Sequence, residues 1–197
     1  MPSQAAQKSA VQTSAVALFA RNFLKYPSML GSVVPSSRFL VKNIMSQVDW
    51  DRARVVVEFG PGVGTITREV LKHMRPDAVL VVIELNEEFV EYLRTTIRDP
   101  RLRIVHGSAA HVRRILAEYG LAPADYIISS LPYSLLPEAL RQEIVAESRN
   151  ALKAQGSLLV FQYNRTLLPY LKSSFSSVKL NFQLFNILPA LIFHCNP

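Results

Sequence analysis

The sequence predicts an α/β fold built on a seven-stranded, mostly parallel sheet whose last strand is antiparallel. From residue 54 onwards, short apolar runs alternate with longer amphipathic segments, a pattern typical of parallel strands connected by helices. The last two apolar runs have only a few residues between them, so the strands that they form should be antiparallel neighbours. A chain of 197 residues is long enough to bury the core of one such domain.

Each predicted strand is a short run of buried-type residues, and each predicted helix places apolar side chains three or four residues apart. The strands are expected at residues 55–59, 78–85, 103–106, 126–129, 157–163, 178–185 and 189–194. The helices that connect them are expected at residues 65–74, 87–98, 111–119, 137–153 and 166–173.

Two further helices are expected before the first strand. Residues 8–25 carry apolar side chains at helical spacing, with basic residues at the edge of the apolar side. The helix should end at Tyr26, because the next residue is Pro27 and the residue before a proline is pushed out of the helical region. Ser36 and Ser37 follow a second proline and supply the start of a helix that runs to about residue 47.

Basic residues gather at the two ends of the chain. The net charge is +7, and residues 1–48 and 148–197 each contain five basic side chains and no acidic one. This distribution favours a polyanionic partner, either nucleic acid or an anionic membrane, although ordinary solvated lysines and arginines would give the same composition. No run reaches the roughly 18 apolar residues of a membrane span. The single cysteine, Cys195, cannot form an intramolecular disulfide, which favours a reducing compartment.

A glycine-rich turn follows the first strand. Gly60, Gly62 and Gly64 stand at alternate positions with Pro61 between the first two, and Glu58 precedes them near the end of the strand. Glycines let the backbone turn sharply and approach a ligand, and the amides at the start of the next helix favour a negative group. In a dinucleotide-binding turn the third glycine would come three places after the second, whereas here it comes two places after.

A second candidate ligand-binding residue lies one strand later. Glu84 ends the apolar run of the second strand, twenty residues beyond Gly64. A carboxylate at that position can accept hydrogen bonds from both hydroxyls of a ribose. The alternative is that Glu84 serves only as an acidic residue at the start of the following helix.

The turn, the acidic residue and the order of elements together resemble the Rossmann-like class I methyltransferases. The resemblance implies S-adenosylmethionine as cofactor, with the turn under its methionine part and Glu84 on its ribose. It places Leu85 against the adenine, and Ser108 and Ala109 near the adenine amino group. Ser108 stands where this class commonly has an aspartate, so its contact would be uncharged.

The segment after the fourth strand, residues 129–133, is similar to two families. Adenine-specific RNA dimethyltransferases carry Asn-Leu-Pro-Tyr there, and Ser130 stands in place of the asparagine. Bacterial phospholipid N-methyltransferases carry Ser-Gly-Leu-Pro there, which residues 129–132 resemble. They also carry a Gly-x-x-x-Pro-Ser-Ser segment, an aromatic-Gln-Tyr segment and a later Asn-x-Pro-Pro-Ala segment. Residues 31–37 and 161–163 match the first two, and residues 186–190 match the third loosely.

The phospholipid N-methyltransferase resemblance covers about residues 20–194 and implies a specific activity. It implies methylation of the amine of phosphatidylethanolamine towards phosphatidylcholine, with a phospholipid substrate and no metal. The enzyme would act in the cytoplasm, peripherally on the inner membrane, held to the anionic surface by the N-terminal amphipathic helix. Residues 1–48 would then form anchor or lid helices and residues 49–197 the catalytic domain.

We expect further roles around the acceptor, with Tyr26 and Tyr133 as the candidate catalytic residues. Tyr26, Ser36 and Ser37 would close over the cofactor, Ser130 and Leu131 would lie beside it, and Tyr133 would line the acceptor pocket. Position 133, like Leu188, departs from the family pattern.

Methyl transfer is an in-line displacement that needs an uncharged amine and can depend mainly on positioning. The four histidines all lie in ordinary helix or strand contexts and are expected to be structural.

Other readings stay open at this point. RNA adenine methylation is the alternative activity, and a non-catalytic cofactor-binding protein is a third reading. The acid-poor, serine-containing start of the chain would also fit an organellar transit peptide.

Overall fold

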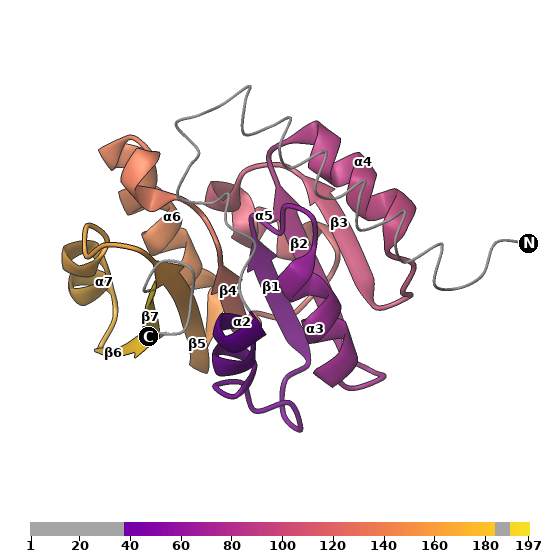
Figure 1. Cartoon of the computed structure of the whole chain (residues 1–197), viewed down its shortest axis with the longest axis horizontal. Coiled ribbons are helices and arrows are strands. Elements are labelled where there is room, and N and C mark those ends of the chain that lie inside the picture. Colours follow the sequence, from indigo (N-terminus) through magenta and orange to yellow (C-terminus); the bar gives the residue numbers. More distant parts are fainter. Residues whose placement is uncertain (1–37, 184–189) are drawn as a thin grey trace, which may run out of the picture.

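A computed structural model describes residues 38–183 and 190–197 of the chain. The helix predicted over residues 8–25 lies outside the described residues, as do Tyr26, Ser36 and Ser37. The described part confirms the predicted fold class: seven strands form one sheet in the order β3-β2-β1-β4-β5-β7-β6 (Figure 1). The strands are β1 (Val55–Phe59), β2 (Val79–Glu84), β3 (Leu102–His106), β4 (Ala124–Ser129), β5 (Leu152–Gln162), β6 (Ser177–Gln183) and β7 (Ala190–Asn196).

The first five strands are parallel, so their carboxyl ends meet at one edge of the sheet. Strand β7 is antiparallel to both of its neighbours, β5 and β6. The prediction of an antiparallel closing pair is confirmed. The sequence did not indicate that β7 would insert between β5 and β6, which makes β6 an edge strand.

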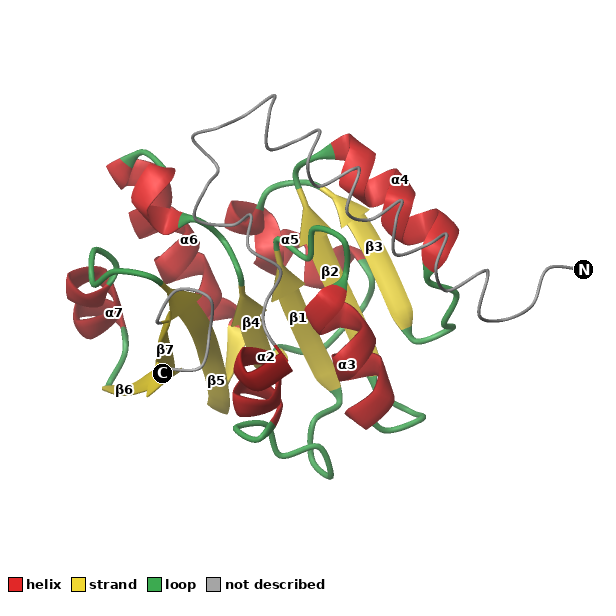
Figure 2. Ribbon diagram, viewed as in Figure 1, coloured by secondary structure: helices red, strands yellow, loops and turns green. Residues whose placement is uncertain are grey.

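Helices cover both faces of the sheet (Figure 2). On one face lie α2, α3 and α4, and on the other lie α5, α6 and α7. The helices are α2 (Arg38–Met45), α3 (Thr65–His73), α4 (Glu87–Thr96), α5 (Val112–Glu118), α6 (Glu138–Ala151) and α7 (Leu168–Ser174), with short 3₁₀ turns at Ala109–His111 and Tyr133–Leu135. The predicted helices agree with these bounds to within a few residues at each end.

Strand β1 lies at the centre of the packing, and every residue in it is buried. Val55, Val57 and Phe59 belong to the apolar cluster beneath α5 and α6, whereas Val56 belongs to the cluster beneath α2 and α3. Because both faces are covered, the strand is apolar at every position but Glu58 rather than alternating. This run of buried-type residues predicted both ends of the strand correctly.

Strand β5 is longer than the sequence indicated. It begins at Leu152 rather than at residue 157, because Leu152 already pairs with Ala124 and the register then shifts before the next pair. Gly156 is required at this irregularity, since a β-carbon there would lie 2.9 Å from the Ala124 carbonyl oxygen and 3.0 Å from that of Asp125. The sequence pattern placed residues 152–153 in the preceding helix, which in the structure ends at Ala151.

Helix α2 is fixed to the sheet by polar contacts at its carboxyl end. The Nδ1 nitrogen of His194 lies 3.1 Å from the amide oxygen of Gln47, and its Nε2 lies 3.0 Å from the hydroxyl oxygen of Ser157. An amide oxygen only accepts, so Nδ1 donates and Nε2 accepts from the serine. The amide N–H of Asp49 also donates to the hydroxyl of Tyr126. These contacts join the segment that follows α2 to strands β4, β5 and β7.

Four side chains of α2 are buried in the same apolar cluster as the strands: Leu40, Val41, Ile44 and Met45. The division of the chain at residue 48 stays a prediction. Among the described residues, no helix is both long enough and apolar enough to cross a membrane.

Candidate active site

The glycine turn between β1 and α3 has a left-handed backbone at all three glycines. The φ angles are +66° at Gly60, +54° at Gly62 and +78° at Gly64, values that side-chain-bearing residues rarely adopt. A β-carbon at Gly64 would lie 2.7 Å from a methyl carbon of Leu93, and one at Gly60 would lie 3.0 Å from a methyl carbon of Leu131. A β-carbon at Gly62 would meet nothing within 4 Å. Gly60 and Gly64 therefore allow close packing, whereas Gly62 leaves open space above the turn.

Glu84 joins the end of β2 to this turn. Its Oε2 accepts a hydrogen bond of 3.1 Å from the amide N–H of Gly62, and its Oε1 accepts one of 2.9 Å from the amide N–H of Asn86. Burial raises the pKa of the Glu84 carboxyl above its ordinary value, and the amide donors oppose that rise. Asn86 caps α4 with its own side chain, so Glu84 is not the capping residue of that helix. Each carboxylate oxygen still has a lone pair for a further donor.

Glu58 is a second buried carboxyl beneath the turn. It is fully buried, and its Oε2 accepts a 2.7 Å hydrogen bond from the hydroxyl of Thr67 on α3. Its Oε1 has no hydrogen-bond partner. Burial raises the pKa of Glu58 to about 8, with a contribution from the charge of Glu84 and opposition from Thr67. A buried carboxyl oxygen without a partner is rare in folded proteins.

The ends of β2 and β3 are held together beside Glu84. The amide of Gly107 donates to the Glu84 carbonyl oxygen at 2.9 Å, and the Nε2 of His106 lies 3.0 Å from the Leu85 carbonyl oxygen. The Leu85 side chain is 72% exposed, which is unusual for a large apolar residue so close to two strand ends. The hydroxyl of Ser108 accepts from the Ala110 amide at 3.3 Å. Leu85 and Ser108 thus lie at the same edge as Glu84.

The loop after β4 lies against the glycine turn. The amide N–H of Ser130 donates to the carbonyl oxygen of Phe59 at 3.0 Å, which places Ser130 and Leu131 next to Gly60. The side-chain amide of Gln162, at the end of β5, donates to the Leu131 carbonyl at 2.8 Å. In the sequence, Gln162 stands out only as part of a family motif. The structure shows that its side chain holds this loop in place.

Tyr133, predicted to line the acceptor pocket, is buried in this structure. Its ring is fully buried in the apolar cluster beneath α5 and α6, and its hydroxyl oxygen lies 3.1 Å from that of Ser129. Burial raises the pKa of the phenol, which keeps it neutral. A ring enclosed in the core cannot present a face to an acceptor, so in this arrangement Tyr133 supports the loop from below. Tyr163, which is half-buried and edge-on to Phe161, stands closer to the surface.

The structure therefore brings together most of the predicted cofactor residues at the carboxyl edge of β1, β2, β3 and β4. Two buried carboxyls, an open glycine backbone and an exposed leucine suit a ligand that offers hydroxyl or ammonium donors and one apolar face. The described residues hold no group of three or more His, Cys, Asp or Glu side chains that could bind a metal ion. The contact of each residue with a cofactor stays a prediction.

Replacing each of two glycines by alanine should separate folding from binding. Gly64→Ala should lower the free energy of unfolding by about 2–4 kcal/mol, because it adds left-handed strain and a clash with Leu93. Gly62→Ala should lower the free energy of unfolding by the backbone strain alone, about 1–2 kcal/mol. It should also weaken binding of S-adenosylmethionine, because the added methyl group fills the open space. Urea unfolding and titration calorimetry measure the two effects. Normal cofactor affinity in Gly62→Ala would show that the ligand does not approach the turn there.

The raised pKa of Glu58 should make stability depend on pH. In the unfolded chain the carboxyl loses its proton near its ordinary pKa of 4.5, whereas in the folded cofactor-free protein it keeps the proton up to about pH 8. The stability that this proton provides is thus full below the unfolded pKa and is lost as pH rises to about 8. Glu58→Gln mimics the protonated form and should remove this loss. Denaturant unfolding of both proteins between about pH 5 and pH 9 tests it, and parallel curves would contradict the assignment.

Comparison with known proteins supports the same chemistry. Residues 28–186 match the family model "Methyltransferase small domain". An ornithine lipid N-methyltransferase of Singulisphaera acidiphila is 28% identical over 184 residues, which cover 90% of this chain and 94% of that protein. A ribosomal RNA small subunit methyltransferase A of Mycoplasma capricolum is 31% identical over 103 residues, or 51% of this chain and 37% of that protein.

The fold is also that of solved methyltransferases. The crystal structure of human methyltransferase-like protein 13 in complex with SAH aligns with a TM-score of 0.62 and 14% identity, covering 81% of this chain and 82% of that one. The family match covers most of the chain, including the glycine turn, Glu84 and the loop after β4. The chain therefore belongs to the methyltransferase small domain family, with the Rossmann-like class I fold, and is an S-adenosylmethionine-dependent methyltransferase.

Proposed function

We propose that this enzyme transfers the methyl group of S-adenosylmethionine to the amine nitrogen of a membrane lipid head group. The observation that carries the proposal is the end-to-end match with an ornithine lipid N-methyltransferase, which spans nearly the whole of both chains. The match to the ribosomal RNA methyltransferase of Mycoplasma capricolum spans little more than a third of that protein. Phosphatidylethanolamine, the acceptor implied by the sequence motifs, and ornithine lipid both join a primary amine to an acidic group and acyl chains.

The residues at the carboxyl edge suit the cofactor. Glu84 is already held by two amides and has free lone pairs for the two ribose hydroxyls. The open space at Gly62 leaves room for the methionine part. Leu85 offers an exposed apolar side chain to the adenine, with Ser108 beside it. When bound, the cofactor supplies a sulfonium methyl group that an uncharged amine can attack.

The chain's own contribution is to position the amine and to remove its proton. Three histidines form hydrogen bonds within the protein. His73 contacts the Glu69 carbonyl, His106 the Leu85 carbonyl, and His194 the side-chain amide of Gln47. His194 uses both ring nitrogens in these contacts, whereas His73 and His106 each use one, on a backbone carbonyl oxygen. Transfer of the amine from water into an apolar pocket lowers its pKa, and that desolvation provides the neutral nucleophile. Positioning then supplies much of the rate.

The acceptor loop supports a lipid amine over a nucleic acid base. Enzymes that methylate a flipped adenine stack it on an exposed aromatic ring and bind its amino group with polar atoms. Here Tyr133 is fully buried, and Ser130 stands in place of the asparagine of the RNA enzymes. A base would therefore lack its stacking partner among the described residues of this loop.

The proposed site of action is the surface of an anionic membrane. The net charge of +7 supports this proposal, because each basic residue near an anionic surface adds roughly 1 kcal/mol of attraction. The segment proposed to insert into the interface, residues 8–25, lies outside the described residues.

Replacing Glu84 should weaken cofactor binding. Glu84→Ala should raise the dissociation constant for S-adenosylmethionine by roughly ten- to a hundredfold, the effect of losing hydrogen bonds to a charged group worth about 1.5–3 kcal/mol. Glu84→Gln keeps one acceptor oxygen, so its dissociation constant should lie between those of the wild type and Glu84→Ala. Glu87→Ala, which removes an exposed carboxylate three residues away, serves as the matched control. Titration calorimetry measures the constants, and unchanged affinity in Glu84→Ala would refute the ribose contact.

A labelled-methyl assay distinguishes the possible acceptors. The full chain should transfer label from S-adenosylmethionine to anionic vesicles that contain phosphatidylethanolamine or ornithine lipid, and not to vesicles of phosphatidylcholine and phosphatidylglycerol. Ribosomal RNA offered in parallel should stay unlabelled. Label in RNA alone would overturn the proposal, and cofactor binding without transfer to any acceptor would indicate a non-catalytic protein.

A further inference from the structure

A large groove lies between α2 and α3, beside the glycine turn rather than in it. It has a volume of about 820 Å³, and its walls come from α2, from the segment after α2 and from one side of α3. Of the residues of the turn and of α3, Thr65 is the first to line it. None of the carboxyls or glycines assigned to the cofactor lines this groove. The groove is therefore a cavity separate from the proposed cofactor site.

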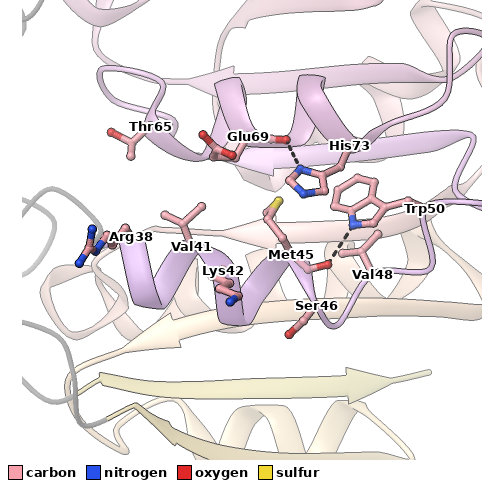
Figure 3. Close-up of a pocket in the computed structure, with 10 residues that line it drawn as sticks. All are labelled: Arg38, Val41, Lys42, Met45, Ser46, Val48, Trp50, Thr65, Glu69 and His73. Carbon is pink, nitrogen blue, oxygen red and sulfur yellow. Dashed lines mark hydrogen bonds between the residues drawn. The ribbon is translucent and has the colours of Figure 1, made fainter.

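The two ends of the groove differ in chemical character. Figure 3 shows Arg38 and Thr65 at one end, and Trp50 with the end of α3 at the other. The first end adjoins the glycine turn, because Thr65 directly follows Gly64. At the far end the indole of Trp50 lies 5.6 Å from the ring of His73, centroid to centroid, and its Nε1 donates to the Met45 carbonyl.

The long walls of the groove are apolar below and cationic at the rim. Val41 and Met45 lie one turn apart on α2 and are almost fully buried, so they form an apolar floor. Arg38 and Lys42 are also one turn apart on α2, and both are exposed. On the opposite wall the carboxylate of Glu69 is paired with a lysine of its own helix, which reduces its repulsion of an anion.

We propose that this groove binds one acyl chain of the lipid substrate, with the acidic group of the lipid at Arg38 and Lys42. The proposal rests on the lipid amine activity proposed above and names the subsite that would hold its substrate. An amphiphile bound in this direction has its head group next to the glycine turn, where the methyl donor is expected. The tail then extends along the apolar floor towards Trp50.

The dimensions fit this occupant. Helix α3 has nine residues, and a rise of about 1.5 Å per residue makes the groove roughly 13 Å long, enough for about ten extended methylene carbons. A volume of 820 Å³ lies within the usual range of roughly 300–1,000 Å³ for small-molecule sites. The remainder of a longer chain would stay in the membrane. This division would let the enzyme take a lipid whose tails remain partly in the bilayer.

The tryptophan gives a direct readout of occupancy. Trp50 is the only tryptophan of the chain, so its fluorescence reports on the far end of the groove alone. The probe is lysophosphatidylethanolamine with a dibrominated acyl chain, offered to the full-length protein below its micelle concentration. Bromine quenches indole emission on contact, so the proposal predicts saturable quenching, and none with the unbrominated lipid. A brominated monoacylglycerol, which lacks the phosphate, should bind more weakly.

Charge variants test the direction of binding. The double variant Arg38→Glu, Lys42→Glu should raise the lipid concentration for half-quenching by at least about tenfold, because it replaces two attractive charges by two repulsive ones. Lys172→Glu, an exposed lysine on α7, should leave it unchanged. Unchanged affinity for S-adenosylmethionine in the double variant shows that the protein is still folded. Equal quenching in the double variant and the wild type would overturn the proposed orientation.

The possible results distinguish failure of the proposed acyl-chain groove from failure of the proposed reaction. Absence of quenching, with lipid methylation intact, would overturn the acyl subsite, and it would indicate that another part of the chain or the bilayer itself holds the tails. Quenching without methyl transfer to any lipid would confirm the lipid site and refute the proposed reaction. If quenching and methyl transfer to lipid both occur, and the charge reversal weakens both, the result supports the acyl-chain groove and the proposed reaction together.

Discussion

The hydrogen bond from the Gly62 amide to the Glu84 carboxylate connects the two halves of the proposed cofactor site. The turn can offer that amide only because Gly62 adopts a left-handed backbone, and Glu84 can stay buried only because amides satisfy its oxygens. The bond thus sets the distance between the turn proposed for the methionine part and the carboxylate proposed for the ribose, before any ligand arrives. Such preorganisation reduces the ordering cost of binding.

The parts of the fold that depend on local pattern were predicted from sequence. Strand β1 is buried on both faces, so its apolar run, interrupted only by Glu58 and ended by a glycine, gave both of its limits. The position of Glu84 at a strand end also follows from spacing along the chain. Strand β5 was predicted too short, because its first two residues were assigned to the preceding helix and pair across a register shift that only the neighbouring strand determines. Gly156 is needed there to avoid backbone atoms of that strand.

The parts of the site that depend on tertiary packing were not predictable in the same way. The aromatic ring of Tyr133 follows a strand end and was expected to face the acceptor, yet it fills space in the core beside Ser129. Gln162 gains its importance from the Leu131 carbonyl, thirty-one residues away in sequence. The groove between α2 and α3 is a property of two helices side by side, and no sequence motif marks it.

The position of β7 has a consequence for how the sheet is assembled. Strand β7 is the last in sequence, yet it separates β5 from β6, so β6 has no partner until β7 has paired with it. During synthesis the earlier strands can collapse as they emerge, but this side of the sheet stays open until the final strand leaves the ribosome. Contacts between distant segments form slowly. The nascent chain would therefore expose one unpaired strand edge late in folding, at the stage when chaperone capture and aggregation compete with completion of the fold.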